Sequence, residues 1–261
     1  MRLRDKVLVI VGGTSGLGLS AARVFIKEGA RVVVVGRDQQ KCHDAGQEFG
    51  PSATTLVGDA SAPNTAAQAI QAALERYGAF HGLYHVAGGS GRARGDGPLD
   101  SITDEGWAYT LQENLTSLFY SNRAAVRQFL TQKSGGSILN MSSVLAFAPS
   151  PRYFGTHAYA ATKAGAVGLT TSAAAHYAPW GIRCNVLAPA LVATPMSQRA
   201  QSDSVILEFI RSKQPLDGGR IGHPSDLDGA AVYFMSDESK FVTGQVLAVD
   251  GGWSVSEGRS A

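Results

Sequence analysis

The chain begins with a strand, a glycine-rich turn and a helix, and this order constrains its fold more than any other feature. Residues 6–11 are a continuous apolar run, residues 12–18 read Gly-Gly-Thr-Ser-Gly-Leu-Gly, and a helical pattern over residues 19–28 ends at Gly29. Backbone N–H groups left bare by glycine, together with a helix N-terminus, favour a negatively charged group. The segment is therefore predicted to bind a phosphate, with a purely structural turn as the alternative.

The same alternation of strand and helix continues along the chain. Further strands are predicted at residues 31–35, 53–57, 82–86, 136–141, 183–187 and 245–249, and helices at 64–77, 103–133 and 225–234. We therefore predict an α/β fold, a single doubly wound Rossmann-type domain of about seven parallel strands with helices on both faces. Ligands of such a fold lie beyond the carboxyl ends of the strands.

Composition indicates one globular unit of 261 residues. Hydrophobic residues make up 44% and charged residues 17%, and no Pro/Ser-rich linker or run of charge divides the chain. We therefore predict a single dinucleotide-binding domain over residues 1–261. Within it, residues 195–224 have no strong period and are expected to form a substrate loop.

Charge and cysteine usage argue against several classes of protein. The net charge of +2 is small and the basic residues are scattered, so nucleic acid and membrane partners are disfavoured, though not excluded. The first apolar run is too short for a signal-peptide core or a membrane span, so a cytoplasmic protein is expected. Cys42 and Cys184 lack metal-ligand spacing, so buried thiols and no metal site are predicted.

Residues at the ends of the early strands bear on the choice of dinucleotide. Gly36 and Arg37 stand at the end of the second strand, where an acidic residue would bond ribose hydroxyls and an arginine accommodates a 2′-phosphate. This favours NADP(H) over NAD(H). Alternatively, Arg37 is a solvated turn residue and Asp38 caps the next helix. Asp59 is a candidate partner of the adenine amino group, and the small residues 87–89 would let a cofactor lie against the backbone.

The middle of the chain offers further polar candidates. Either Arg92 or Arg94, in the glycine-rich segment 90–99, would meet an anionic substrate, or both lie in a solvated and mobile loop. Asn114 interrupts a predicted helix, which indicates bonding to backbone or water at a bend, or a surface position. A hydroxyl of residues 142–143, at the end of the fifth strand, would face the ligand crevice.

Tyr159 and Lys163 are a candidate proton-transfer pair. On a helix, a spacing of four places the phenol and the ammonium on one face. A neighbouring cation stabilises a phenolate and lowers the pKa of the phenol below its usual value of about 10. Tyr159 is therefore expected to give or take a proton near neutrality, unless the pair shares a helix face by chance.

Taken together, these stretches resemble the short-chain dehydrogenase/reductase family from about residue 6 to residue 253. The specific elements are Gly12-x-x-x-Gly16-x-Gly18, Asp59, Ala87-Gly88, Asn114, Ser143, Tyr159-x-x-x-Lys163 and residues 243–252. The resemblance implies an oxidoreductase that transfers a hydride between NADP(H) and an alcohol or ketone. The alternatives are an NAD(H)-dependent dehydrogenase of the same family, a non-catalytic dinucleotide-sensing protein, or an epimerase or dehydratase.

The resemblance also implies roles for individual residues. By this likeness Ser143 polarises the substrate oxygen, Tyr159 is the general acid/base, Lys163 lowers its pKa and holds the nicotinamide ribose, and Asn114 supports a water. The cofactor-binding residues that it implies are Gly12, Thr14, Ser15, Gly16, Leu17, Gly18, Arg37, Asp59, Ala60, Ala87, Gly88, Tyr159, Lys163, Pro189, Val192 and Thr194. The implied partners are a small carbonyl or alcohol substrate and further copies of the chain in a homotetramer.

Some positions depart from the usual pattern of the family. Val11 stands where a threonine usually opens the glycine motif, and His85-Val86 precede Ala87 where two asparagines are usual. A side-chain tie behind the cofactor site is therefore expected to be lost or replaced. Inserted residues 149–154 leave Ser142 as an alternative donor to the preferred Ser143. The pocket candidates, Leu145, Tyr153, Phe154, His157 and Leu191, are mostly apolar and indicate a ring or hydrophobic ketone.

Overall fold

The computed structural model describes residues 1–258 and contains a seven-stranded parallel sheet. Its strands are β1 (Val7–Val11), β2 (Arg31–Gly36), β3 (Ala53–Val57), β4 (Gly82–His85), β5 (Gly136–Met141), β6 (Ile182–Pro189) and β7 (Val246–Val249). Their order across the sheet is β3-β2-β1-β4-β5-β6-β7. The predicted doubly wound fold is thus confirmed, and the strand order reverses between β1 and β4, where such folds bind ligands.

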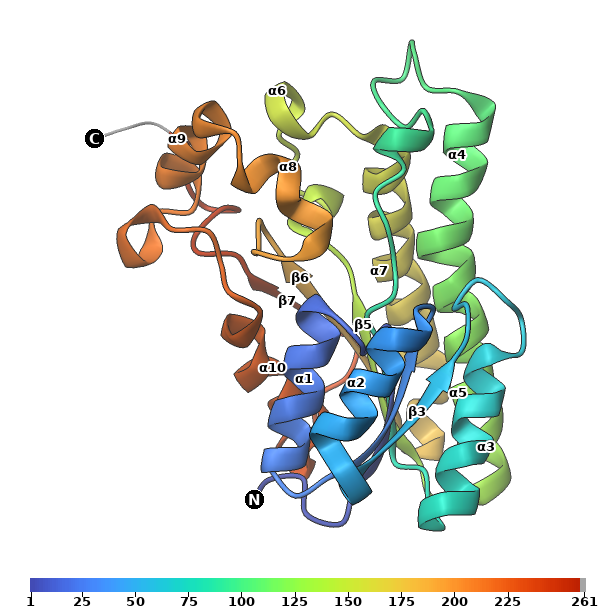
Figure 1. Ribbon diagram of the computed structural model, residues 1–261. Coiled ribbons are helices and arrows are strands. Elements are labelled where there is room, and N and C mark those ends of the chain that lie inside the picture. Colours follow the sequence, from blue (N-terminus) through green and yellow to red (C-terminus); the bar gives the residue numbers. More distant parts are fainter. Residues whose placement is uncertain (259–261) are drawn as a thin grey trace.

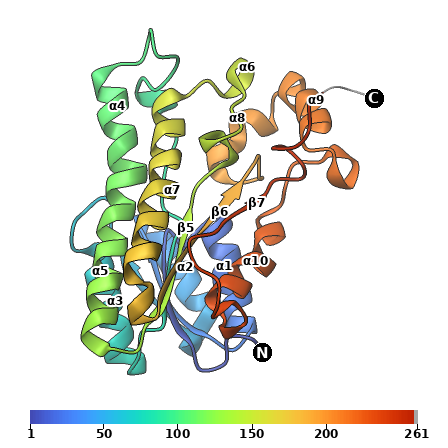
Figure 2. The same cartoon turned by 180° about the vertical axis from the view of Figure 1, so that it is seen from behind.

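Helices cover both faces of this sheet (Figures 1 and 2). One face carries α1 (Gly16–Lys27), α2 (Gln39–Phe49) and α10 (Asp228–Met235), and the other carries α3 (Thr65–Tyr77), α5 (Ser117–Gln132) and α7 (His157–Tyr177). Strand β1 shows why its sequence is apolar throughout. Leu8 and Ile10 pack on the first face, whereas Val7, Val9 and Val11 pack on the second.

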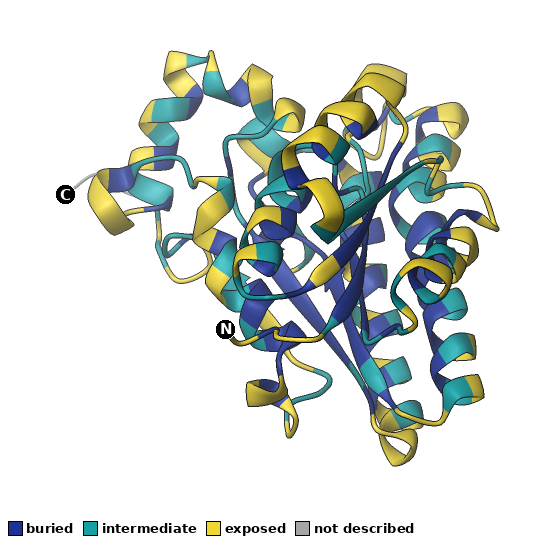
Figure 3. Ribbon diagram, turned by 60° about the horizontal axis from the view of Figure 1, so that its bottom comes forward, coloured by how far each residue is buried: buried dark blue, intermediate teal, exposed yellow. Residues whose placement is uncertain are grey.

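Strands β1 and β4 are buried from end to end and β2 is buried except at Arg31, whereas exposed residues lie on the outer sides of the helices (Figure 3). Burying one valine or leucine side chain contributes about 1.5 to 3 kcal/mol, so the continuous apolar runs supply much of the driving force for folding. Cys42 and Cys184 are buried and unpaired, as predicted.

The long predicted helix over residues 103–133 is confirmed, but it contains a change of pitch. It consists of α4 (Asp104–Leu111), the π-helical turn η3 (Gln112–Thr116) and α5. Thr103 caps its start, because its hydroxyl accepts a hydrogen bond from the N–H of Gly106 at 2.9 Å. A π turn holds one extra residue within a helix and is frequent at functional sites.

The segment predicted as a substrate loop is largely helical. It contains η6 (Pro195–Ser197), α8 (Gln198–Gln201), α9 (Ser204–Lys213) and η7 (Leu216–Gly219), and η8 (Pro224–Leu227) leads into α10. Ile206 and Ile210 are buried on one side of α9 against Val144 and Trp253. With only two buried positions in a short helix, the period was too weak to be detected in the sequence. Together with α6 (Pro151–Phe154), α8 and α9 lie beyond the carboxyl ends of the strands (Figure 1).

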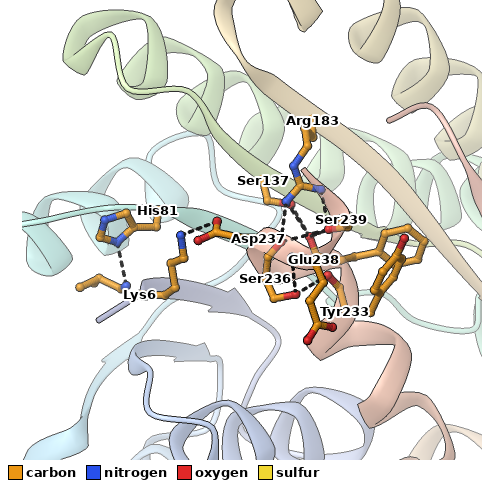
Figure 4. Close-up of polar contacts among 11 residues, drawn as sticks. Lys6, His81, Ser137, Arg183, Tyr233, Ser236, Asp237, Glu238 and Ser239 are labelled. Carbon is orange, nitrogen blue, oxygen red and sulfur yellow. Dashed lines mark hydrogen bonds and ion pairs between the residues drawn. The ribbon is translucent and has the colours of Figure 1, made fainter. Parts of the chain in front are cut away.

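Polar contacts centred on Arg183 close the amino end of the sheet (Figure 4). Its guanidinium donates hydrogen bonds to the Ser239 hydroxyl at 2.8 Å and to the Phe234 carbonyl at 3.0 Å. Arg183 thereby satisfies carbonyl groups at the end of α10 that have no partner within the helix. Nearby, Lys6 forms an ion pair with Asp237 at 2.7 Å. This end of the sheet is therefore stabilised by groups of the chain itself.

Candidate active site

A cavity of about 440 Å³ opens at the carboxyl ends of the strands. Most of the predicted site residues line it: Gly12, Thr14, Ser15, Gly16, Leu17, Arg37, Asp59, Ala60, Ala87, Gly88, Ser143, Tyr159, Lys163, Pro189, Val192 and Thr194. Gly18 and Asn114 are absent from this lining and lie behind the residues that form it. The structure therefore brings together residues from nearly the whole length of the chain.

The glycine turn after β1 leaves room for a ligand at the N-terminus of α1. Gly12 has a φ of +91°, and a Cβ atom there would lie 2.6 Å from the backbone nitrogen of Ala87. A Cβ atom on Gly18 would collide with the carbonyl oxygen of Gly12. The first turn of α1 has no acidic residue that would compete for its N–H groups. These features fit the phosphates of a dinucleotide.

Arg37, after β2, is paired with an acidic residue that sequence reasoning missed. Its guanidinium lies 3.0 Å from the carboxylate of Glu113, which is only 11% exposed and also lines the cavity. These two residues are 76 positions apart, so no local sequence pattern predicts the contact. Asp38 accepts hydrogen bonds from the N–H groups of Gln40 and Lys41 at 2.9 and 3.0 Å, so it caps α2, as the alternative interpretation expected.

Asp59, after β3, also faces the cavity near this end. One of its carboxylate oxygens accepts hydrogen bonds from the N–H and the hydroxyl of Ser61, both at 2.8 Å. These bonds fix the orientation of the side chain and leave acceptor capacity on a carboxylate. Its contact with an adenine amino group remains a prediction.

Asn114 lies in the π turn and bonds to backbone, as its position in a helix indicated. Its amide nitrogen donates to the carbonyls of Gly89 and Thr110, both at 2.9 Å, and its oxygen accepts from the N–H of Gly89 at 3.2 Å. The side chain is 1% exposed. Asn114 therefore fixes the turn that follows β4 from behind the cavity wall.

The two serines after β5 have different partners. The Ser142 hydroxyl donates to the carbonyl of Lys163 at 2.7 Å and is thus committed to the backbone of α7. The Ser143 hydroxyl accepts a hydrogen bond from the N–H of Leu145 at 3.2 Å and faces the phenol of Tyr159, whose pKa it lowers. This geometry favours Ser143 as the donor to a ligand, the residue that the sequence had also favoured.

Tyr159 and Lys163 share a face of α7, and Lys163 is buried whereas Tyr159 is half-buried in the crevice. The ammonium lies over the phenol ring, 5.3 Å from its centroid, and donates to the carbonyl of Met141 at 3.2 Å. Burial raises the pKa of Tyr159 to about 12, because a desolvated phenolate is destabilised more than the Ser143 hydrogen bond stabilises it. Burial also lowers the pKa of Lys163 to about 8. The expectation that Tyr159 titrates near neutrality is therefore wrong for this geometry.

Asp96, in the segment between β4 and α4, holds the start of α7 in place. Its two carboxylate oxygens accept hydrogen bonds from the N–H groups of Ala158 and Tyr159, both at 3.0 Å. The side chain is 4% exposed, and a carboxylate at a helix N-terminus is stabilised by the helix dipole. The segment is further bound by the N–H of His157, which donates to the Gly97 carbonyl at 3.1 Å. Sequence reasoning missed this anchor because no short motif marks it.

His85 makes a side-chain contact behind the cavity, where the departure from the family pattern predicted that the usual contact is lost or replaced. Its ring nitrogen Nδ1 lies 2.9 Å from the Ser121 hydroxyl, and the Ser117 hydroxyl lies 3.5 Å from Nε2. Burial lowers the pKa of His85 to about 3, so the ring is neutral at physiological pH. The contact joins β4 to α5 behind the cavity.

The remaining wall of the cavity is mainly apolar. Of the predicted pocket residues, Leu145, Phe154 and Leu191 line it, whereas Tyr153 and His157 do not. Tyr153 instead packs against the ring of Phe209, with 4.9 Å between centroids. The lining also includes Met196, Arg92, Arg199 and Trp253. This end of the cavity is large enough for a small molecule with an apolar body.

Several other kinds of site are absent from the part of the chain that the structure describes. Within residues 1–258, no helix combines the length and the apolar character that a membrane crossing requires. In the same residues, no group of three or more His, Cys, Asp or Glu side chains is arranged to hold a metal ion.

Comparisons with known proteins point to one family. A sequence model described as enoyl-(acyl carrier protein) reductase matches residues 11–254. The L-rhamnose 1-dehydrogenase (NAD(P)(+)) of Azotobacter vinelandii is 34% identical, over 97% of this chain and 98% of the relative. A 3β-hydroxysteroid dehydrogenase of Eggerthella lenta is 33% identical, over 98% of this chain and 96% of the relative.

Solved structures give the same result. A short-chain dehydrogenase/reductase from Mycobacterium ulcerans superposes with a TM-score of 0.89 at 29% identity, covering 98% of this chain and 92% of that one. A 3-ketoacyl-(acyl-carrier-protein) reductase from Brucella melitensis, solved with NADH, gives a TM-score of 0.85 at 28% identity, covering 97% of this chain and all of that one. The chain belongs to the short-chain dehydrogenase/reductase family of oxidoreductases.

Proposed function

We propose that this enzyme transfers a hydride between NADP(H) and the carbinol or carbonyl carbon of a small molecule, with Tyr159 as the general acid/base. The observation that carries the proposal is that Ser143, Tyr159 and Lys163 line the same cavity as the glycine turn at the start of α1. A bound nicotinamide dinucleotide supplies or accepts the hydride. The chain must then control the proton and the charge on the substrate oxygen.

Ser143 and Tyr159 provide the hydrogen-bond donors for that oxygen. Reduction of a ketone builds negative charge on its oxygen, and two fixed donors in a buried site stabilise that charge. With a pKa of about 12, Tyr159 is a neutral phenol at physiological pH and holds the proton that the product alcohol needs. Lys163 carries the charge that stabilises the phenolate left behind, and Asn114 is a positioning residue for the adjacent turn.

Arg37 supports NADP(H) over NAD(H), because a guanidinium at the end of β2 suits a 2′-phosphate. Glu113 competes for that guanidinium, so the predicted preference is moderate, and NAD(H) use by this fold is the alternative. The A. vinelandii relative is named for both cofactors, and the B. melitensis structure contains NADH. The preference therefore rests on Arg37 and is tested separately below.

A homotetramer in the cytoplasm is the assembly and location that we propose. Large apolar side chains are exposed on the helices that carry Asn114, namely Trp107 at 43% and Phe119 at 40%. Others are exposed at the last strand, where Leu247 is 41% exposed, and before it, where Phe241 is fully exposed. Apolar side chains gathered in this way favour contacts between copies. Light scattering on the purified protein measures the number of copies.

Replacing Tyr159 with phenylalanine tests the catalytic proposal. Tyr159→Phe should lower the turnover of any accepted alcohol or ketone by about 100-fold or more, because it removes the proton donor and leaves the ring in place. Affinity for the dinucleotide should stay the same. Tyr153→Phe is the matched control, since Tyr153 lies outside the cavity lining and should keep full activity. Near-normal turnover in Tyr159→Phe would refute the assignment. Cofactor binding by the unaltered protein, with no turnover of any alcohol or ketone, would favour the sensing protein.

A further inference from the structure

Two arginines from distant parts of the chain line the substrate end of the cavity. Arg92 comes from the short helix η2 (Arg92–Arg94) after β4, and Arg199 comes from α8. Both side chains are exposed at the mouth of the cavity that also contains Ser143 and Tyr159. The fold therefore collects two cations around the entrance to an otherwise apolar pocket.

Neither arginine has a carboxylate partner in the part of the chain that the structure describes. Arg199 donates one hydrogen bond to the Tyr153 carbonyl at 3.0 Å and lies over the ring of Phe154, 5.9 Å from its centroid. A guanidinium has five N–H donors, so most of those on Arg199 remain available.

The neighbouring arginine gives a contrast within the same short helix. Arg94 lies 3.9 Å from the carboxylate of Glu105 and stacks over the ring of Tyr109 at 5.4 Å. Arg94 is absent from the cavity lining. The charge of Arg94 is thus compensated outside the site, whereas that of Arg92 is directed into it.

Asp96 acts on the charge of Arg92 but forms no ion pair with it. Asp96 uses both carboxylate oxygens to hold the backbone N–H groups at the start of α7. Burial lowers the pKa of Arg92, the charge of Arg199 lowers it further, and Asp96 acts in the opposite direction. An anion bound by both guanidinium groups would offset the repulsion between their charges.

We propose that Arg92 and Arg199 bind an anionic group of the substrate, a carboxylate or a phosphate, while Ser143 and Tyr159 bind its reacting oxygen. This inference rests on the proposed function and specifies the substrate class for the same site. The apolar side chains of Leu145, Phe154 and Leu191 between these polar groups suit a substrate with a hydrocarbon body. The substrate is thus an oxo acid or hydroxy acid, or a phosphorylated ketone or alcohol.

Matched pairs of charged and neutral compounds test this assignment on the full-length enzyme with NADPH and NADH. The pairs are levulinate and its methyl ester, oxocyclohexane carboxylate and its methyl ester, and dihydroxyacetone phosphate and dihydroxyacetone. For at least one pair, kcat/KM for the anion should exceed that for the neutral compound by about 10- to 100-fold, as charge-assisted hydrogen bonds imply. The oxo acids and the phosphate separate the two sources of negative charge.

Four variants locate the effect. Arg92→Gln and Arg199→Gln should each remove most of the preference for the anion, by raising KM for it and leaving the neutral compound unchanged. Arg94→Gln is the control, and its preference should equal that of the unaltered enzyme, because Arg94 is paired outside the cavity. Arg92→Lys should retain part of the preference, since the charge remains and the bidentate geometry is lost.

The outcomes separate this inference from the proposed function. The anion site is overturned if the neutral compounds are turned over at least as well as the anions and if neither glutamine variant changes this. The oxidoreductase assignment then remains intact. If no compound is turned over, calorimetric titration with hexanoate and phenyl phosphate decides. Binding that Arg92→Gln weakens about tenfold or more supports the site, and no binding, or equal binding to both proteins, overturns it.

Discussion

The two ends of the sheet differ in whether their charged side chains have partners within the chain. At the amino end, Arg183 and Lys6 find acceptors within the chain (Figure 4). At the carboxyl end, Lys163 is buried with one hydrogen bond to a carbonyl, and Arg92 has no acidic partner among residues 1–258. The amino end contributes stability, whereas the carboxyl end keeps groups available for ligands at the expense of stability. This contrast leads to three predictions.

The largest effect is expected at the amino end, where Arg183→Met should destabilise the fold. The change removes the guanidinium donor from the carbonyls of Phe234 and Ser236, which keep only serine hydroxyl donors. Losing several charge-assisted hydrogen bonds together costs about 3 to 4 kcal/mol. Urea unfolding of the two proteins measures the difference. Cofactor affinity and turnover of the folded variant should not change, because Arg183 lies at the opposite end of the sheet from the cavity.

Arg4→Met is the control for this change. Arg4 is exposed near the same end, and its replacement should alter stability by no more than about 0.5 kcal/mol. If Arg183→Met were as stable as this control, the polar contacts of Figure 4 would be ordinary surface contacts and the contrast between the two ends would fail.

The second prediction concerns Lys163, whose buried charge works against folding. Its pKa is about 8 in the folded protein, below its ordinary value of 10.5. At pH 7 both the folded and the unfolded chain carry the proton, so the folded state bears the full penalty of a desolvated charge. The shift in pKa corresponds to roughly 3 to 4 kcal/mol, and the lost hydrogen bond to the Met141 carbonyl offsets part of it. Lys163→Met should therefore stabilise the fold at pH 7 by about 2 to 3 kcal/mol.

The stability difference between the parent and Lys163→Met should depend on pH. Between pH 8 and 10.5 the folded state loses the proton before the unfolded state does, so the unaltered protein gains stability relative to Lys163→Met and the difference disappears. Thermal unfolding across this range follows the difference, with exposed Lys240→Met as the control that should show no such trend. A variant that is less stable than the parent at pH 7 would mean that its surroundings stabilise the ammonium. Catalysis should be lost in Lys163→Met at every pH.

The fold was predictable because its determinants are local. The apolar runs give the strands, and the glycines of residues 12–18 give the turn and the helix start. Asn114 marked a bend because an asparagine is a poor helix former, although the π turn itself was not foreseen. Helix α9 was missed because only two of its positions, Ile206 and Ile210, are buried.

The unpredicted parts of the site depend on contacts between distant residues. The pairing of Arg37 with Glu113 and the anchoring of α7 by Asp96 join segments far apart in the sequence. The pKa of Tyr159 was assigned the wrong direction because the sequence reveals a neighbouring lysine but not the degree of burial, which outweighs it. The sequence shows the chemistry of each residue, but it does not show which distant residues are in contact or how far each is buried.

The smallest effect is expected for Arg37, because a 2′-phosphate must displace Glu113 from its guanidinium. Arg37→Ala should weaken NADPH by about tenfold, or about 1.4 kcal/mol, which is near the low end for a charge-assisted contact because the guanidinium is 59% exposed. NADH affinity should stay within about twofold of the parent, because NADH lacks the 2′-phosphate. Fluorescence titration of both reduced cofactors measures the two affinities.

Glu113→Gln sharpens the test, because it frees Arg37 without removing it. The change also removes a negative charge that lies 3.0 Å from the guanidinium. It should therefore strengthen NADPH by about threefold, and this gain should vanish in the double variant with Arg37→Ala, since the two residues act through one ion pair. Equal effects of Arg37→Ala on NADH and NADPH would identify Arg37 as a bystander. In that case the ion pair with Glu113 would be a structural contact, like those at the amino end of the sheet.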